Sequence, residues 1–68
     1  MNEATVSRFV VFCLEAYKRA NDLSGIAAVK IFLRYGIVDY LRDGYDALHS
    51  LGELALIDDI TDYIAHRG

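Results

Sequence analysis

Apolar residues recur at intervals of three and four along this chain, and no proline interrupts them. That spacing places apolar side chains on one face of an α-helix, because the helix repeats every ~3.6 residues. No alternation of polar and apolar residues is long enough for a strand. The sequence therefore predicts an all-α protein: a compact bundle of three longer helices, with one or two short helices in the 37–51 segment.

The length sets the next constraint, because 68 residues leave room for a single helical domain spanning 1–68. A chain this short buries only ~60 % of the surface that its unfolded form exposes. Hydrophobic residues nevertheless make up 54 % of it, and its one cysteine cannot form an internal disulfide. We therefore expect another chain to cover part of the apolar surface, either a different protein or a second copy in a homo-oligomer.

The first helix is predicted from about Ala4 to Ala20, and it is apolar on more than one side. Such a helix is either central in the fold or packed against a partner. Val11 and Phe12 lie off the stripe that an intramolecular core would use. We therefore take them as candidate partner-contact residues.

A second helix is predicted to begin after Ser24, whose hydroxyl is suited to cap a helix N-terminus, and to end near Tyr35. Lys30 and Arg34, four residues apart, form its solvated basic side. Its predicted buried face consists of Ile26, Val29, Phe32 and Leu33.

Glycines at 36, 44 and 52 divide the rest of the chain. Glycine is preferred just after a helix, where the backbone turns left-handed. We therefore expect short helices near Val38–Asp43 and Asp46–Leu51, each ended by a glycine, with apolar contacts closing the turns at Gly36 and Gly44.

The last helix is predicted from about Leu54 to His66. Its predicted core face contains Ile57, Ile60 and Ile64, supported by Leu56 and Tyr63.

Charge and targeting signals indicate where the protein works. The net charge of −3 provides no long-range attraction to phosphate, so nucleic acid is disfavoured as a partner. Met1 leads into Asn2 and Glu3 without the basic and apolar segments of a secretory signal. The longest apolar run, Phe9 to Leu14, is far shorter than the ~20 residues of a membrane span. We expect a cytoplasmic protein without membrane association.

Two aspartate–histidine pairs have spacings that suit chemistry. Asp46 and His49, three apart, and Asp62 and His66, four apart, are each candidates for a base with its orienting carboxylate or for two metal ligands. Neither pair has the further groups that a catalytic or metal site needs. Cys13 lies in the most apolar run, where a thiol is inert. We expect no catalytic residue, no metal site, no cofactor and no enzymatic activity.

Tyrosines at 35, 40 and 45 do not form one stripe, because residues five apart on a helix point ~140° apart. Tyrosine combines an apolar ring with a polar tip and suits protein interfaces. Tyr35 and Tyr40 are therefore further candidates for a partner surface.

The helix before Gly36 and the segment 38–43 could form a helix-turn-helix. The would-be recognition helix carries Asp39, Asp43 and Asp46 against one Arg42, which disfavours DNA readout.

The order FVVFCLEAYK, SGIAAVKIFLRYGIVDYL, YDALHSLGE and DDITDYI resembles a family of short bacterial proteins, domain of unknown function 3791. Its most specific parts are the Tyr35–Gly36 pair with Tyr40–Leu41, and the pattern formed by Tyr45, Asp46, Leu48, His49 and Gly52. The resemblance implies a stand-alone cytoplasmic helical protein. It also implies an antitoxin-like or accessory role beside toxin-like proteins, and it supplies no catalytic residues.

Together these observations favour a non-enzymatic protein-interaction module. The resemblance further implies that this module is antitoxin-like or accessory to a toxin-like partner. A DNA-binding transcriptional regulator acting in a complex is the alternative. A small metal-binding or enzymatic protein using Asp46 and His49, or Asp62 and His66, is the second alternative.

Overall fold

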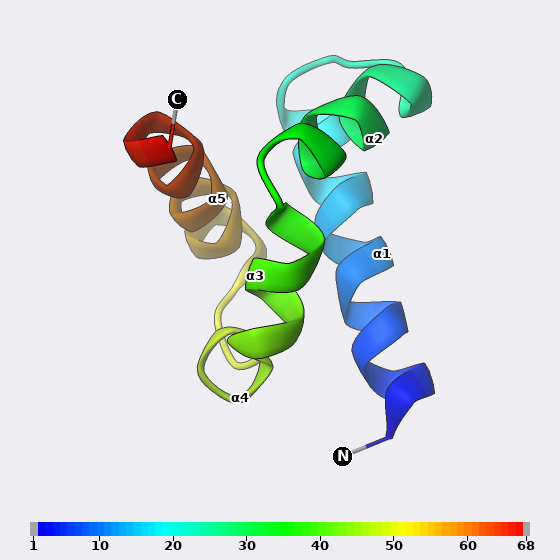
Figure 1. The fold of residues 1–68 in the computed structure, drawn as a ribbon, viewed down its shortest axis with the longest axis vertical. Helices are drawn as coiled ribbons and strands as arrows, with labels where there is room; N and C mark the ends of the chain where they lie inside the picture. The colour runs from blue at the N-terminus through cyan, green and yellow to red at the C-terminus, as the bar shows by residue number, and fades with distance from the viewer. Residues whose placement is uncertain (1, 68) are drawn as a thin grey trace.

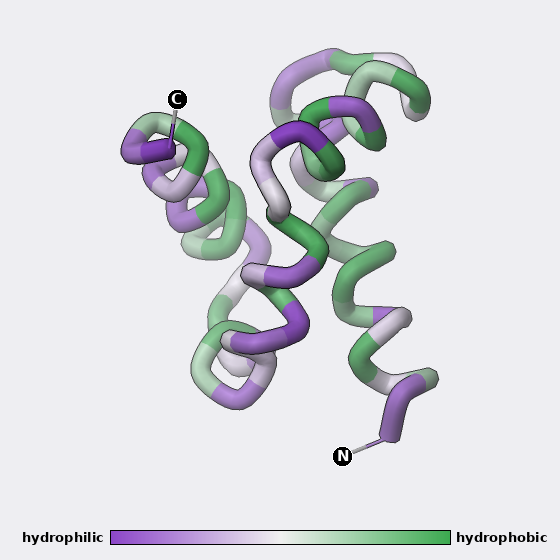
Figure 2. Tube along the Cα trace, viewed as in Figure 1, coloured by the Kyte–Doolittle hydropathy of each residue, from purple (hydrophilic) through white to green (hydrophobic). Residues whose placement is uncertain are grey.

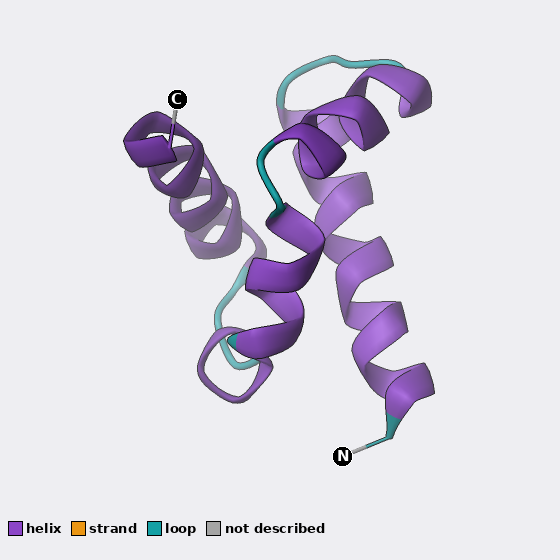
Figure 3. Ribbon diagram, in the orientation of Figure 1, coloured by secondary structure: helices purple, strands orange, loops and turns teal. Residues whose placement is uncertain are grey.

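The computed structural model describes residues 2–67 and folds them into five α-helices without a strand (Figures 1 and 3). The helices are α1 (Glu3–Ala20), α2 (Gly25–Arg34), α3 (Ile37–Asp43), α4 (Tyr45–Leu48) and α5 (Glu53–Arg67). The predicted all-α fold is confirmed, with three longer helices and two short ones in the 37–51 segment. The Cα radius of gyration, 11.1 Å, matches the ~11 Å of a compact chain of this length.

The longest helix, α1, is the centre of the packing and contacts α2, α3 and α5. In Figure 1, α2 lies across the end of α1, α3 runs down in front, and α5 stands on the opposite side of the view from α2. The core that they enclose is formed by Cys13, Tyr17, Phe32, Ile37, Leu41, Leu48, Leu56 and Ile60. Every helix therefore contributes at least one side chain to a single core.

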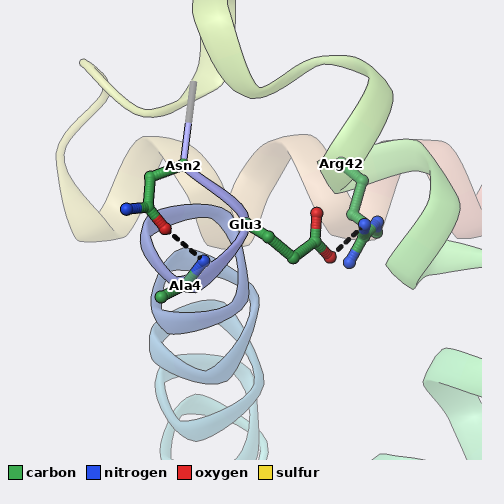
Figure 4. A network of polar contacts seen from close by, with 4 residues as sticks. All are labelled: Asn2, Glu3, Ala4 and Arg42. Carbon is green, nitrogen blue, oxygen red and sulfur yellow. Dashed lines mark hydrogen bonds and ion pairs between the residues drawn. The ribbon is translucent and has the colours of Figure 1, made fainter.

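Helix α1 begins with a side-chain cap. The Asn2 carboxamide oxygen accepts a hydrogen bond from the Ala4 backbone N–H at 2.7 Å (Figure 4), which satisfies one of the unpaired donors at a helix start. The next residue, Glu3, forms an ion pair with Arg42 of α3. The start of α1 is thus tied to α3 as well as capped.

The turn between α1 and α2 contains a left-handed residue, Asp22, with φ of 53°. Its N–H donates to the Arg19 carbonyl and the Leu23 N–H to the Lys18 carbonyl, the bond pattern of a Schellman helix end. Ser24 then caps α2 by accepting from the Ala27 N–H at 3.1 Å. The predicted capping role of Ser24 is confirmed.

Two glycines that the sequence treats alike have different structural roles. Gly36 ends α2 with φ of 64°, the left-handed conformation that glycine adopts without a steric penalty. Gly44 has φ of −95°, so the prediction of a left-handed turn there is wrong. A Cβ at Gly44 would lie 2.9 Å from Leu48 Cδ1 and 3.2 Å from the Tyr40 carbonyl oxygen. Glycine at 44 thus provides space for α4 to pack close behind α3.

The last helix follows Gly52, whose carbonyl accepts from the Leu56 N–H at 3.0 Å. Gly52 therefore lies immediately before α5 and accepts the first hydrogen bond of that helix, whereas the short helix α4 already ends at Leu48. Leu56 and Ile60 are buried, each 1 % exposed, and the other predicted core residues of this helix are partly buried. An Arg19–Glu53 ion pair of 3.1 Å ties the end of α1 to the start of α5.

Candidate functional site

The outer face of α2 carries three large aliphatic side chains. Ile26 is 71 % exposed, Val29 41 % and Leu33 70 %. Their spacing of three and then four residues places them along one side of the helix. We call these three residues the α2 stripe. Figure 2 shows the apolar segments of α2 at the top right of the molecule, away from α5.

The sequence predicted that Ile26, Val29 and Leu33 would be buried together with Phe32. That prediction is confirmed for Phe32 and wrong for the three residues of the stripe. The buried residues of α2 are Ala28, which is fully buried, and Phe32, which is 2 % exposed. They lie four apart on the side that faces the core, and Phe32 packs in a tilted ring contact with Tyr17 of α1, 5.8 Å between centroids. Because α2 is apolar on both sides, its periodicity does not distinguish the face packed against α1 from the face exposed to solvent.

Basic side chains border the α2 stripe. Lys30 follows Ile26 by four residues and precedes Leu33 by three, so it neighbours both; Arg34 lies one turn further along. Both are exposed, and α2 contains no acidic residue. The three ion pairs among residues 2–67 use the cations Lys18, Arg19 and Arg42, so no carboxylate in that range holds Lys30 or Arg34. Arg34 rests over the Tyr35 ring at 5.4 Å.

On α1, Val11 is 56 % exposed and Phe12 is 45 % exposed. Consecutive helical residues point ~100° apart, so the two side chains leave α1 in different directions. The structure places both on the surface, as the sequence reasoning required. Their role as a partner contact stays a prediction.

Tyr40, another predicted interface residue, is engaged within the chain. Its hydroxyl donates to the Asp59 carboxylate at 2.5 Å, and its ring stacks on Tyr63 with centroids 3.9 Å apart. The hydrogen bond to Asp59, with a smaller effect of burial, raises the pKa of Tyr40 to about 12. Tyr35, the remaining predicted interface residue, is half-buried against the core. Both tyrosines thus present only part of their surface to solvent.

The structure does not bring Asp46 and His49 together as a reactive pair. His49 stacks on Tyr45, with ring centroids 4.5 Å apart and an interplanar angle of 8°. Its Nδ1 lies 2.7 Å from the Tyr45 carbonyl oxygen, which can only accept, so Nδ1 carries the proton. Tyr45 in turn meets the edge of Phe9 at 5.3 Å. His49 therefore extends an aromatic row that joins α4 to α1.

In the second aspartate–histidine pair, the histidine contacts the backbone of the aspartate rather than its carboxylate. His66 Nδ1 lies 2.7 Å from the Asp62 carbonyl oxygen, and both residues are exposed. Among residues 2–67, no three or more of the histidines, cysteines and carboxylates gather where they could share a metal ion. No pocket opens in the same range, and none of its helices is long and apolar enough to cross a bilayer.

Cys13 lies in the core and is 1 % exposed. Burial raises the pKa of its thiol to about 11, because the apolar surroundings disfavour the charged thiolate. The thiol is therefore held in its unreactive form at neutral pH, as the sequence predicted.

Sequence reasoning missed the α2 stripe as a surface feature and assigned it to the core. A signal was present: Ala28 and Phe32 form a second row, four residues apart, beside the stripe. A helix with two apolar rows has one row more than a single packing partner needs. The small side chain of Ala28 favours the row that allows close helix packing.

These features define a small all-helical protein with an exposed aliphatic row on α2. The chain belongs to the DUF3791 family, described as "Protein of unknown function (DUF3791)", whose family model matches residues 8–67. The resemblance seen in the sequence is thereby confirmed. No curated protein and no solved structure matches the chain.

Proposed function

We propose that this protein is a non-enzymatic protein-interaction module that binds its partner through the α2 stripe. The observation that supports the proposal is the exposure of Ile26 and Leu33, 71 % and 70 %. Burying an aliphatic side chain of this size is worth ~1.5–3 kcal/mol. A partner that covers the stripe recovers free energy that folding of the single chain leaves unused.

The arrangement suits a known form of recognition. An amphipathic helix that binds a partner presents apolar side chains at positions i, i+3 or i+4, and i+7. Ile26, Val29 and Leu33 have this spacing, on a helix that is fixed in place by the packing of Ala28 and Phe32. Because the helix is already folded, binding does not pay the ordering cost of a disordered segment.

Two further elements belong to the proposal. Val11 and Phe12 on α1 are a second candidate contact, since both are exposed. Masking of a toxin-like protein is the form of the function that the family resemblance implies. A second copy of the chain is the alternative occupant of the interface.

Affinity capture with matched variants tests the proposal. Tagged wild-type protein, Leu33→Asp and Leu54→Asp are used to recover proteins from a lysate of the cells that make the protein. Leu54 is 77 % exposed on α5, so its substitution places the same charge on an exposed aliphatic position outside the stripe. We expect a partner that is retained by wild type and Leu54→Asp and lost with Leu33→Asp.

Recovery of the same proteins by wild type and both variants contradicts the proposed surface. Sedimentation of the purified chain separates self-association from binding of another protein. A homodimer forms from the purified chain as its concentration rises, whereas a complex with another protein does not. Phe12→Asp is the matching variant for α1. If it changes neither recovery nor oligomeric state, Phe12 is not a contact residue.

A further inference from the structure

We propose that the α2 stripe binds an acidic amphipathic helix of another protein: one with apolar residues facing the stripe and carboxylates facing Lys30 and Arg34. This inference rests on the proposed function and specifies the chemistry of the partner. It is based on the charges around the stripe rather than on the stripe alone.

The α2 helix is basic within an acidic protein. Its only charged residues are Lys30 and Arg34, both exposed, whereas the whole chain carries a net charge of −3. Lys30 lies one turn from both Ile26 and Leu33, so a helix packed on the stripe must pass close to its ammonium group. Neither cation is paired with a carboxylate of residues 2–67; Arg34 contacts only the Tyr35 ring, so both charges remain available to carboxylates of the partner.

The same charges disfavour a second copy of α2 as the occupant. In an antiparallel pair of identical helices, equivalent edges face each other. Lys30 and Arg34 of one copy would then face the same cations of the other, and α2 has no carboxylate to compensate them. Like charges at the edge of a helix pair are destabilising, whereas opposite charges steer association and set specificity.

An anionic membrane surface could also bind an apolar row bordered by cations, but it fits the α2 stripe less well than an acidic helix does. Membrane-surface helices carry many cations on their polar face, and α2 has two within a 10-residue helix. The net charge of −3 also repels anionic lipid. A protein helix with a few carboxylates at its edge matches two cations better.

Two designed peptides of about three heptads test the inference. Both carry Leu at the core positions of each heptad; one has Glu at the flanking positions and the other has Lys. Each is titrated into the isotope-labelled full chain while backbone amide signals are followed by NMR. We expect the Glu peptide to shift the signals of Ile26, Val29 and Leu33 and to bind at least roughly tenfold more tightly than the Lys peptide.

Variants and salt make the test specific. Leu33→Asp should abolish the shifts and Leu54→Asp should retain them, with circular dichroism showing that both variants remain helical. The double variant Lys30→Glu with Arg34→Glu should reverse the preference in favour of the Lys peptide. Raising NaCl from about 50 mM to about 500 mM should narrow the difference between the peptides, because exposed charges are screened.

Equal affinity for the two peptides, no binding of either, or shifts centred outside α2 overturns the inference. Concentration-dependent dimerisation that Leu33→Asp abolishes overturns it in favour of a second copy. Binding to vesicles of anionic lipid that competes with the Glu peptide overturns it in favour of a membrane surface. If lysate capture still depends on Leu33 while the peptides show no charge preference, the proposed function stands and only the acidic partner is rejected.

Discussion

The Tyr40 hydroxyl donates a hydrogen bond of 2.5 Å to the carboxylate of Asp59, nineteen residues further along the chain. The bond joins α3 to α5, and the Tyr40 ring stacks on Tyr63 of the same helix. A charged acceptor makes such a bond stronger than one between neutral groups. The contact between α3 and α5 is therefore polar as well as apolar.

Removing that hydroxyl should destabilise the fold. We expect Tyr40→Phe to lower the free energy of unfolding by about 1.5–3 kcal/mol, the usual contribution of a hydrogen bond to a charged group, measured by urea denaturation. Tyr35→Phe is the control, since the Tyr35 hydroxyl has no hydrogen-bond partner among residues 2–67 and its loss should change little. Equal effects of the two substitutions would show that the Tyr40–Asp59 bond adds nothing.

The same bond makes stability depend on pH in the alkaline range. The pKa of Tyr40 is raised from 10.0 to about 12 in the folded chain, so the folded state holds this proton more tightly than the unfolded state. Its contribution is fully present below pH ~10 and is lost as the pH rises through about 12. Absorbance at the tyrosinate band should show one late-titrating tyrosine that is missing in Tyr40→Phe. A wild-type curve with no late component contradicts the assignment.

Alanine at two glycine positions should have opposite effects. At Gly44 a methyl group meets Leu48 and the Tyr40 carbonyl oxygen, so Gly44→Ala should destabilise by ~1–3 kcal/mol, as overpacking does. At Gly25 a Cβ would have no atom within 4 Å, so Gly25→Ala should be neutral or stabilise by up to ~1 kcal/mol. Thermal melts of the two variants check this. Equal melting temperatures would show that Leu48 moves aside at no cost.

The buried thiol should be slow to react. With its pKa raised from 9.0 to about 11, Cys13 has roughly a hundredfold smaller thiolate fraction at neutral pH than an unperturbed thiol. Ellman's reagent should therefore modify it slowly in the native protein and rapidly in denaturant. Fast modification of the native chain would contradict the burial of Cys13 in the core.

Helix bounds could be predicted to within a few residues from apolar spacing and turn residues, because these signals are local. Ser24 and Gly36 are examples: a cap and a left-handed turn depend on neighbours in sequence. The face that α2 buries could be predicted only in part: Phe32 was expected in the core, but the apolar spacing did not separate the row of Ala28 and Phe32 from the α2 stripe, and the choice depends on packing against α1. Likewise the space required at Gly44 and the hydrogen bond of Asp59 depend on residues brought together only by the fold.

For the candidate binding surface, too, only the features that depend on local sequence could be predicted. Val11 and Phe12 could be placed outside the core from the sequence, because they lie off the stripe that an intramolecular core would use, although they widen the apolar surface of the helix. The α2 stripe could not, because its spacing is also that of a core face. Phe32 and Leu33 were both expected in the core, and only the folded structure shows that Phe32 is buried while Leu33 is exposed.

Site-specific photo-crosslinking in the cells that make the protein tests the central claim most directly. A benzoylphenylalanine is introduced in place of Leu33 on the α2 stripe or, as the matched control, in place of Leu54 on α5. We predict a discrete adduct with another protein from position 33, absent from position 54 and lost when Ile26→Asp is added. An adduct from position 54 alone, or identical adducts from both positions, would contradict the assignment of the α2 stripe as the binding surface.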